Sequence, residues 1–309
     1  MKLDVILATY NRADILRGAL ESFAVAARPF GARVRLVVVD NNSTDHTAAV
    51  VAEFRSRWPG ACLALFEPKQ GKHHALNCAM ARIKADLVGQ FDDDERLAPD
   101  WVEVIFANMA DPATDFIGGP VVPEWDVTPP DWLPRAGYGG VLGLVDNGPV
   151  RRRYGEPGFP AMLTGANFAM RRVVLAACGP YRDGDLYAED RYMWNQLMRL
   201  GAQGWWVPEL AVRAKVPAKR LTKAYYRRWA FQEGRTLGKE TRQAGGTLLG
   251  APRWLWGEAL RNAATSFAGL VRPMEPSRRF LAEIELRKFA GYYIARNLPF
   301  IRDTYYSRA

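Results

Sequence analysis

Apolar runs typical of buried strands alternate with segments of helical periodicity along the first 90 residues. The predicted strands are residues 2–9, 34–40, 62–66 and 85–89. Between them, apolar positions recur at three- and four-residue spacing and predict helices around residues 15–23, 50–54 and 71–83. This alternation predicts an α/β fold with a mainly parallel sheet and helices on both of its faces.

A cluster of four acids, Asp92–Glu95, directly follows the fourth predicted strand. Parallel strands end at one edge of their sheet, so we expect this cluster to face a cleft together with Thr9, Asp40 and Gln70. Adjacent carboxylates repel one another, and Mg²⁺ or Mn²⁺ with a phosphate-bearing substrate commonly neutralises such a group. The alternative is a solvated acidic turn ahead of the next helix.

Two common nucleotide-binding motifs do not occur in the sequence. No GxGxxG follows the first strand and no GxxxxGK[ST] occurs, which argues against a dinucleotide fold and a P-loop. The three cysteines, Cys62, Cys78 and Cys178, form no CxxC pair and fit structural thiols in a reducing cytoplasm. We expect no secretion signal at the first residues and no membrane span, since no apolar stretch reaches about 18 residues.

Positive charge is concentrated in the last third of the chain. The net charge is +9, and from Ala211 onward 20 Lys and Arg stand against 7 Asp and Glu, which leaves a net of −4 for the first 210 residues. The basic part predicts an anionic partner such as a membrane surface, a pyrophosphate or a charged acceptor. Nucleic acid is suggested only by charge, and no motif supports it.

Five short motifs occur in the order typical of one enzyme family. They are Thr9-Tyr10-Asn11-Arg12, Val38-Val39-Asp40-Asn41-Asn42-Ser43-Thr44-Asp45, Glu67-Pro68-Lys69-Gln70-Gly71-Lys72 with Ala75-Leu76-Asn77, Phe91-Asp92-Asp93-Asp94, and Pro99-Asp100-Trp101. As an ordered set they resemble the family-2 glycosyltransferases of the GT-A fold. The resemblance covers residues 1–235, with a nucleotide-binding half at 1–115 and an acceptor half at 116–235. Residues 236–309 form a basic helical extension.

The resemblance implies an inverting, metal-assisted hexosyltransferase that uses a nucleotide sugar, with a UDP-sugar favoured. It implies that Asp40 contacts the base of the nucleotide, and that Asp92 and Asp94 form a D-x-D element. Asp94 would bear most directly on Mn²⁺ or Mg²⁺. The other donor-binding residues that it implies are Thr9, Asn11, Arg12, Asn42, Gln70, Lys72, Asn77 and Asp93.

Two later segments are candidates for acceptor binding. Residues 118–134 are rich in Pro and Trp and predict a loop, whose Trp125 can stack on a sugar ring or simply fill the core. Residues 163–172 resemble the G-A-N segment of the family, with Gly165 and Asn167 at its conserved places. Glycine permits close approach of backbone to a substrate, and the amide of Asn167 offers both a donor and an acceptor.

An acidic pair, Glu189-Asp190, opens a predicted helix. The resemblance implies that Asp190 is the base that deprotonates the acceptor hydroxyl, and that Glu189 orients the acceptor. Stabilisation of the helix N-terminus by two acids is the alternative.

Two positions depart from the family pattern. Ala214 stands where a metal-binding His is often found, and a methyl group cannot ligate a cation. Tyr225 replaces the Gln of the Q-x-x-R-W element of processive synthases, so we expect transfer of one or a few sugars. In that element Arg228 can hold the leaving diphosphate, or it can belong to a basic helix face.

The basic extension contains two amphipathic helical patterns. Apolar residues recur at Trp256, Leu260, Ala263, Ala264, Phe267 and Leu270, and again at Leu286, Phe289, Ala290 and Tyr293. Such helices can lie peripherally on the inner face of a membrane, pack on the catalytic domain, or join a second copy in a homodimer.

We therefore expect an enzyme of cell-surface polysaccharide synthesis that acts on a glycan or lipid-linked acceptor. The alternatives are a sugar nucleotidyltransferase, which lacks its Gly-rich loop here, and a nucleotide-sugar-binding relative with little turnover.

Overall fold

The computed structural model describes residues 1–133, 139–181, 189–240 and 246–298. Pro134, at the end of the expected loop, and the side chain of Leu270 lie outside the described part. The chain forms two compact units. The first comprises residues 1–124 and 143–215, and the second comprises residues 125–142 and 216–309.

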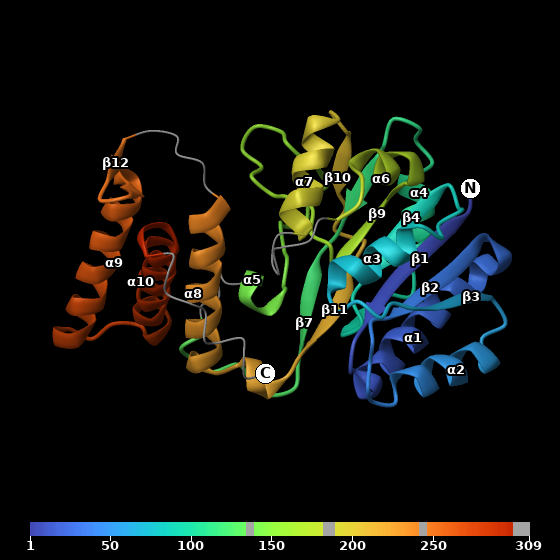
Figure 1. Cartoon of the computed structure of the whole chain (residues 1–309), viewed down its shortest axis with the longest axis horizontal. Coiled ribbons are helices and arrows are strands. Elements are labelled where there is room, and N and C mark those ends of the chain that lie inside the picture. Colours follow the sequence, from blue (N-terminus) through green and yellow to red (C-terminus); the bar gives the residue numbers. More distant parts are fainter. Residues whose placement is uncertain (134–138, 182–188, 241–245, 299–309) are drawn as a thin grey trace. The chain divides into compact units, whose positions relative to one another are not determined.

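The first unit contains an eight-stranded sheet with the order β3-β2-β1-β4-β9-β6-β10-β8. Its strands are β1 Leu3–Thr9, β2 Val34–Asp40, β3 Ala61–Phe66, β4 Leu87–Phe91, β6 Phe116–Gly118, β8 Arg152–Arg153, β9 Asn167–Arg171 and β10 Gly204–Trp206. Strands β1 to β4 pair in parallel, as does β6 with β10, whereas β9 runs antiparallel between β4 and β6. The predicted α/β class with a mostly parallel sheet is confirmed (Figure 1).

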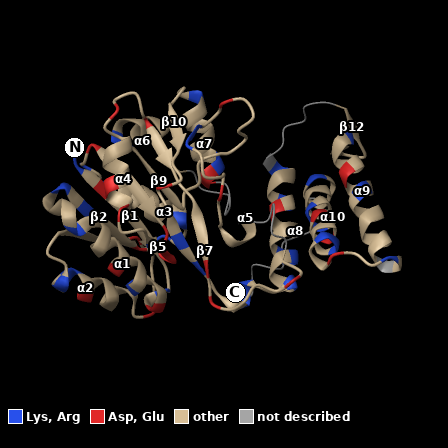
Figure 2. Cartoon of the chain, turned by 180° about the vertical axis from the view of Figure 1, so that it is seen from behind, with Lys and Arg blue, Asp and Glu red and all other residues tan. Residues whose placement is uncertain are grey.

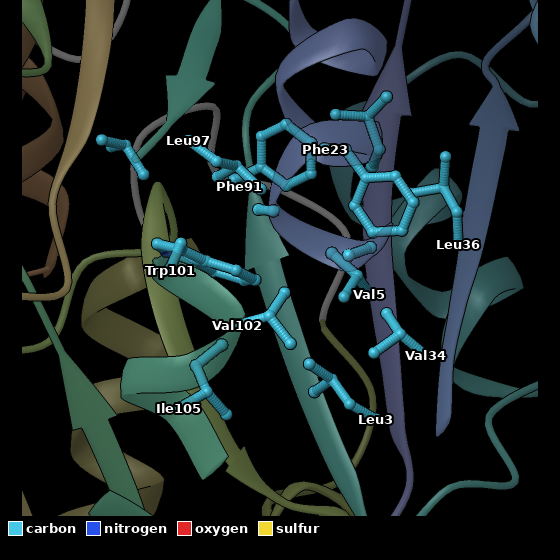
Figure 3. Close-up of a cluster of buried hydrophobic side chains, with 14 of the residues drawn as sticks. Leu3, Val5, Phe23, Val34, Leu36, Phe91, Leu97, Trp101, Val102 and Ile105 are labelled. Carbon is cyan, nitrogen blue, oxygen red and sulfur yellow. The ribbon is translucent and has the colours of Figure 1, made fainter. Parts of the chain in front are cut away.

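Helices cover both faces of this sheet. They are α1 Ala13–Ala27, the 3₁₀ helix η1 Arg28–Arg33, α2 Thr47–Arg57, α3 Lys72–Met80, α4 Trp101–Asn108, α6 Arg172–Cys178 and α7 Glu189–Arg199. Alternate residues of a strand point to opposite faces, so β1 contributes to two cores. Leu3 and Val5 lie in the core with Phe23 of α1 and Trp101 of α4 (Figure 3), whereas Ile6 belongs to the core on the α3 side.

A second, three-stranded sheet joins segments from both expected halves of the domain. It has the order β5-β11-β7, formed by β5 Glu95–Leu97, β11 Val212–Val216 and β7 Val121–Trp125. The prediction that residues 118–134 form a loop is therefore wrong over Val121–Trp125. Pro123 interrupts the strand pattern in the sequence, but β7 is an edge strand, where a missing amide donor is tolerated.

The second unit is helical in its described part. It contains α5 Gly139–Leu142, the 3₁₀ helix η2 Ala218–Arg220, α8 Lys223–Glu240, the short strands β12 Thr247–Leu248 and β13 Ala251–Pro252, α9 Arg253–Val271 and α10 Pro276–Asn297. Helices α8 and α10 approach so closely that a Cβ added at Gly234 would lie 1.9 Å from the carbonyl oxygen of Lys288. The boundary at residue 235 falls inside α8 and remains a prediction, since it was drawn from motifs.

Helix α9 packs on α10 with only part of the expected apolar face. The ring of Trp256 lies 4.9 Å from that of Phe289, whereas Leu260 and Phe267 are 67% and 68% exposed. Blue Lys and Arg positions are spread along α8 and α10 (Figure 2). No helix in the described part is long and apolar enough to cross a membrane.

Candidate active site

The carboxyl ends of the central strands bring the sequence-predicted donor residues to one edge of the sheet. Thr9, the last residue of β1, pairs in register with Asp40, the last residue of β2. Strand β4 is the other neighbour of β1 and ends at Phe91, immediately before Asp92. Thr9 and Asp40 are both buried. This edge is the ligand-binding edge of open α/β sheets.

Asn11 joins the turns that follow β1 and β2. Its φ is +49°, a left-handed conformation that Asn adopts more readily than most residues. The amide N–H of Asn11 donates to Ser43 Oγ at 2.9 Å, and Asn11 Oδ1 accepts from the amide of Thr44 at 2.7 Å. The neighbouring Asn42 is also left-handed, with φ +63°, and is exposed. Asn11 and Asn42, both expected to bind the donor, therefore lie in the turns at the carboxyl ends of β1 and β2.

Asn41 was missed in the sequence analysis, although it is a buried organiser of the same edge. Its Nδ2 donates to the carbonyl oxygen of Lys69 at 2.7 Å, and its Oδ1 accepts from the amide of Gly71 at 2.8 Å. A weaker contact of 3.4 Å joins Gln70 Nε2 to the same Oδ1. Asp40 Oδ1 accepts from the amide of Ser43 at 3.0 Å. Its place between two motif residues was the signal that could have identified Asn41.

Two basic side chains pair with three carboxylates of the acid cluster. Arg12 Nη1 lies 2.7 Å from Asp93 Oδ1 and 3.0 Å from Asp94 Oδ2, and Lys72 Nζ lies 2.6 Å from Asp92 Oδ1. Burial raises the pKa of Asp93, against the opposing charge of Arg12. Burial also opposes the charge on Arg12, but Asp93 and Asp94 outweigh it and raise the pKa of this guanidinium. Arg12 and Lys72, which the resemblance implies as donor-binding residues, thus contact the D-x-D region.

The position of Ala214 lies beside the cluster, as the family pattern implied. Ala214 of β11 pairs with Glu95 of β5, and the amide of Lys215 donates to the carbonyl oxygen of Asp94 at 2.9 Å. Glu95 is 2% exposed and accepts from the amide of Asp92 at 2.7 Å, which fixes the turn between β4 and β5. Burial, and after it the charge of Asp92, raises the pKa of Glu95 well above its ordinary range.

The donor set fits a divalent cation that is shared with a substrate. In the described part of the chain, no group of three or more His, Cys, Asp or Glu could hold a metal ion by itself. Asp92 and Asp94 keep 28% and 15% of their side chains exposed, while Asp93 keeps 7% and faces Arg12. Mg²⁺ and Mn²⁺ are commonly held by one or two carboxylates together with substrate phosphates. Asp92 and Asp94 match that arrangement.

The acidic pair opens α7 beside the segment that precedes β9. The backbone N–H of Gly165 donates to the carboxylate of Asp190, and a Cβ added at Gly165 would lie 2.5 Å from Asp190 Oδ1. Partial removal from water raises the pKa of Asp190, although Lys72 opposes the shift. Removal from water likewise raises the pKa of Glu189, to about 6, against the opposing charge of Lys72. The charge of Lys72 thus acts on both members of the pair as well as on Asp92.

Two other predicted residues of the first unit have structural partners. Asn167 is fully buried, donates to the carbonyl oxygens of Pro120 and Leu210 and accepts from Trp101, so its amide serves the fold. The amide of Asn77 makes two hydrogen bonds to the backbone of Tyr181.

Trp125, at the end of β7, is 36% exposed, and Arg228 is exposed on α8. Both belong to the second compact unit, so their contacts with substrates stay predictions.

The fold and the carboxylates at its edge define the protein as a GT-A-type enzyme. The model of glycosyl transferase family 2 matches residues 4–179, and the chain belongs to this family. It is 24% identical over 270 residues to the succinoglycan biosynthesis protein ExoM of Rhizobium meliloti, covering 86% of this chain and 82% of that protein. The protein is thus a family-2 glycosyltransferase, an enzyme class that uses nucleotide-sugar donors.

Solved structures show the same fold. The mannosyltransferase PcManGT from Pyrobaculum calidifontis, in complex with GDP-Man and Mn²⁺, is 19% identical with a TM-score of 0.64 and covers 95% of this chain and 86% of its own. Residues 1–349 of S. aureus TarS in complex with UDP are 14% identical with a TM-score of 0.54, covering 96% and 90%.

Proposed function

We propose that this enzyme transfers a hexose, with inversion, from a UDP-sugar to a hydroxyl of a glycan or lipid-linked acceptor during cell-surface polysaccharide synthesis. The observation that carries the proposal is the position of Lys72. This cation contacts Asp92 of the D-x-D element and acts electrostatically on Asp190 and Glu189, so the donor and acceptor carboxylates meet around one group. Similarity to ExoM supports the polysaccharide context.

Donor binding is assigned to the strand ends. Asp40 holds the base, and the turn residues Asn11 and Asn42 line the entrance. Arg12 and Lys72 are already positioned beside carboxylates, where they can pair with diphosphate oxygens, since cations at such an edge attract phosphate. Asp94 and Asp92 would hold Mn²⁺ or Mg²⁺, which when bound supplies positive charge to the leaving diphosphate. UDP is favoured because it is the commonest nucleotide of the family.

Asp190 acts as the base of the transfer. Its carboxylate takes the proton of the acceptor hydroxyl while that oxygen attacks the anomeric carbon from the face opposite to the diphosphate. The bond from the anomeric carbon to the diphosphate oxygen breaks, and the nucleoside diphosphate carries the electron pair away. Glu189 orients the acceptor. Because attack is direct, the product has the inverted configuration and no covalent intermediate forms.

Features of the second unit bear on how many sugars are added and on where in the cell the enzyme acts. Tyr225 replaces the Gln of processive synthases, which supports addition of one or a few sugars. The basic helices and the exposed side chains of α9 support peripheral attachment at the inner, cytoplasmic face of the cell membrane.

The test combines ligand binding with turnover. A thermal-shift screen of nucleotide sugars with and without Mn²⁺ should identify a donor, because ligands that bind only the native state raise the melting temperature. Asp94→Ala should abolish the Mn²⁺-dependent part of this shift. Asp190→Asn should keep it while turnover falls by the ~10²- to 10⁴-fold typical of losing a general base.

Glu103→Gln is the matched control, since Glu103 is another acid in the first turn of a helix and is exposed. It should retain full activity. An active Asp190→Asn enzyme would overturn the assignment of the base. Donor binding without transfer or Mn²⁺-dependent donor hydrolysis in the wild type would instead indicate a binding relative.

A further inference from the structure

Gln90 is a buried polar residue in an otherwise apolar strand. It is the fourth residue of β4, is 2% exposed, and lies in register between Ile6 of β1 and Phe168 of β9. Burying an amide costs free energy unless it is hydrogen-bonded, so an apolar residue would suit this core position better by packing alone. The presence of an amide at this position therefore indicates a role other than packing.

Gln90 is linked to the proposed catalytic base, Asp190, through the backbone of Gly165. Gln90 Nε2 donates to the carbonyl oxygen of Gly165, and the N–H of Gly165 donates to Asp190. A Cβ built on Gly165 would lie 2.5 Å from Asp190 Oδ1 and 3.4 Å from Gln90 Nε2. The carbonyl oxygen of Gly165 thus accepts from Gln90 while its N–H donates to the carboxylate, and an added Cβ would force Asp190 to shift.

We propose that Gln90 is a positioning residue for catalysis, which acts through the backbone of Gly165 to fix the carboxylate of Asp190. The inference rests on the proposed role of Asp190 as the base. Gln90 extends from the central strand that also leads to Asp92, so one strand sets both the D-x-D element and, through Gly165, the base. Such a link keeps the distance between donor and base constant, and small misplacements of reacting groups are costly.

Gln90→Met tests the link, because methionine has a similar length and no amide donor. We expect kcat to fall by about 10- to 100-fold, as misplacement of a reacting group by about 1 Å does. The affinity for the nucleotide sugar, measured by calorimetry with Mn²⁺, should stay at the wild-type value. Thr114→Val is the matched control. Thr114 is another fully buried polar residue of the first unit, and its Oγ1 has no hydrogen-bond partner among the described residues, so kcat should be unchanged.

A double variant separates positioning from general support of the fold. If Gln90 acts through Asp190, adding Gln90→Met to Asp190→Asn should cost little more than Asp190→Asn alone, because residues that act as a unit are not additive. A full further 10- to 100-fold loss in the double variant would overturn the proposal, as would a wild-type kcat for Gln90→Met.

Gly165→Ala provides a second route should Gln90→Met lose its native melting transition. The added methyl group displaces Asp190 directly, so the same fall in kcat with unchanged donor affinity is expected, and wild-type kcat would contradict the proposal. Failure of the base assignment is distinguishable, since Asp190→Asn would then be active whatever the result at Gln90.

Discussion

Lys72 interacts with Asp92 and with the acidic pair Glu189-Asp190, and the balance of charge around it determines how the site responds to pH. Partial removal from water disfavours the charged forms of Asp190 and Glu189, while the charge of Lys72 favours them. The first effect is larger for both, so each pKa is raised. A base with a raised pKa is a stronger proton acceptor near neutral pH, which suits deprotonation of a sugar hydroxyl.

This balance predicts a pH-dependent stability that is carried by Glu189. Its pKa is about 6 in the folded protein against an ordinary 4.5, so the native state binds the proton more tightly than the unfolded state does. The free energy of unfolding should therefore fall as the pH rises from about 4.5 to about 6. In Glu189→Gln this contribution disappears, and the melting temperature relative to wild type should rise across the same interval.

Glu156 provides a contrast of opposite sign. Its hydrogen bond from Arg152, at 2.6 Å, lowers its pKa, so its contribution is present above the ordinary value and is lost as the pH falls. Glu156→Gln should lower the melting temperature at neutral pH and lose that effect in acid. Parallel melting curves for Glu189→Gln and wild type between pH 4.5 and 6 would contradict the role of Glu189.

Individual site residues could be predicted from sequence to different degrees. Asp40, Asp92 and Asp94 were expected at one edge of the sheet because they follow apolar strands, and the structure places them at the ends of β2 and β4. Their ligand-binding roles come from the family resemblance and stay predictions. The hydrogen bonds of the Asn167 side chain could not be predicted from sequence, because only the fold brings Trp101, Pro120 and Leu210 to its amide. Asn41 lies between the predicted residues Asp40 and Asn42, which was a usable signal, but its bonds to Lys69 and Gly71 depend on the fold.

At the scale of elements, local periodicity was sufficient for β1 to β4 and insufficient for the other strands. A buried strand between two helices is recognisable from its own residues, as with Val34–Asp40. The antiparallel insertion of β9 between β4 and β6 depends on contacts more than 40 residues apart in sequence, such as Gly89 with Ala169. Sheet order therefore required the structure, although the class of sheet did not.

The pairing of β5 with β11 predicts the consequence of restoring the family histidine. Residues opposite each other in an antiparallel pair have Cβ atoms about 4.5–5.5 Å apart, so a side chain at position 214 lies beside Glu95 and close to Asp94. Ala214→His should add a nitrogen ligand. Changes around a metal site typically alter affinity by about 10- to 100-fold, so Mn²⁺ affinity in the presence of UDP should tighten by at least about tenfold.

Ala214→Phe is the control for bulk. Ala214 is 6% exposed, so the ring introduced by either the His or the Phe substitution crowds the strand pair. Each substitution should cost about 1–3 kcal/mol of stability. Only the histidine variant should bind Mn²⁺ more tightly in a calorimetric titration. Equal affinities for His, Phe and wild type would show that position 214 does not face the metal.

At the scale of the whole molecule, charge and exposed apolar area coincide in the second unit. Leu260, Phe267 and Val271 are 67%, 68% and 68% exposed on α9 and repeat at spacings of seven and four residues, which places them on one helix face. The basic end of the chain has the composition that attracts anionic lipid, and each Lys or Arg near such a surface contributes about 1 kcal/mol. An exposed apolar stripe of this kind commonly marks a docking surface.

We therefore expect the full-length protein to float with vesicles that contain anionic lipid, and to bind neutral vesicles less. Raising the salt concentration should weaken binding, because charges beyond about 8 Å are screened at 0.15 M ionic strength. Phe267→Asp should abolish flotation, since it places a carboxylate in the middle of the stripe. Val173→Asp is the matched control, because Val173 is 64% exposed on helix α6 of the first unit and its substitution should leave flotation unchanged.

If the wild type stays in the soluble fraction at low salt and light scattering gives twice the monomer mass, the stripe joins two copies instead. Phe267→Asp would then yield monomers, and the membrane assignment would be withdrawn.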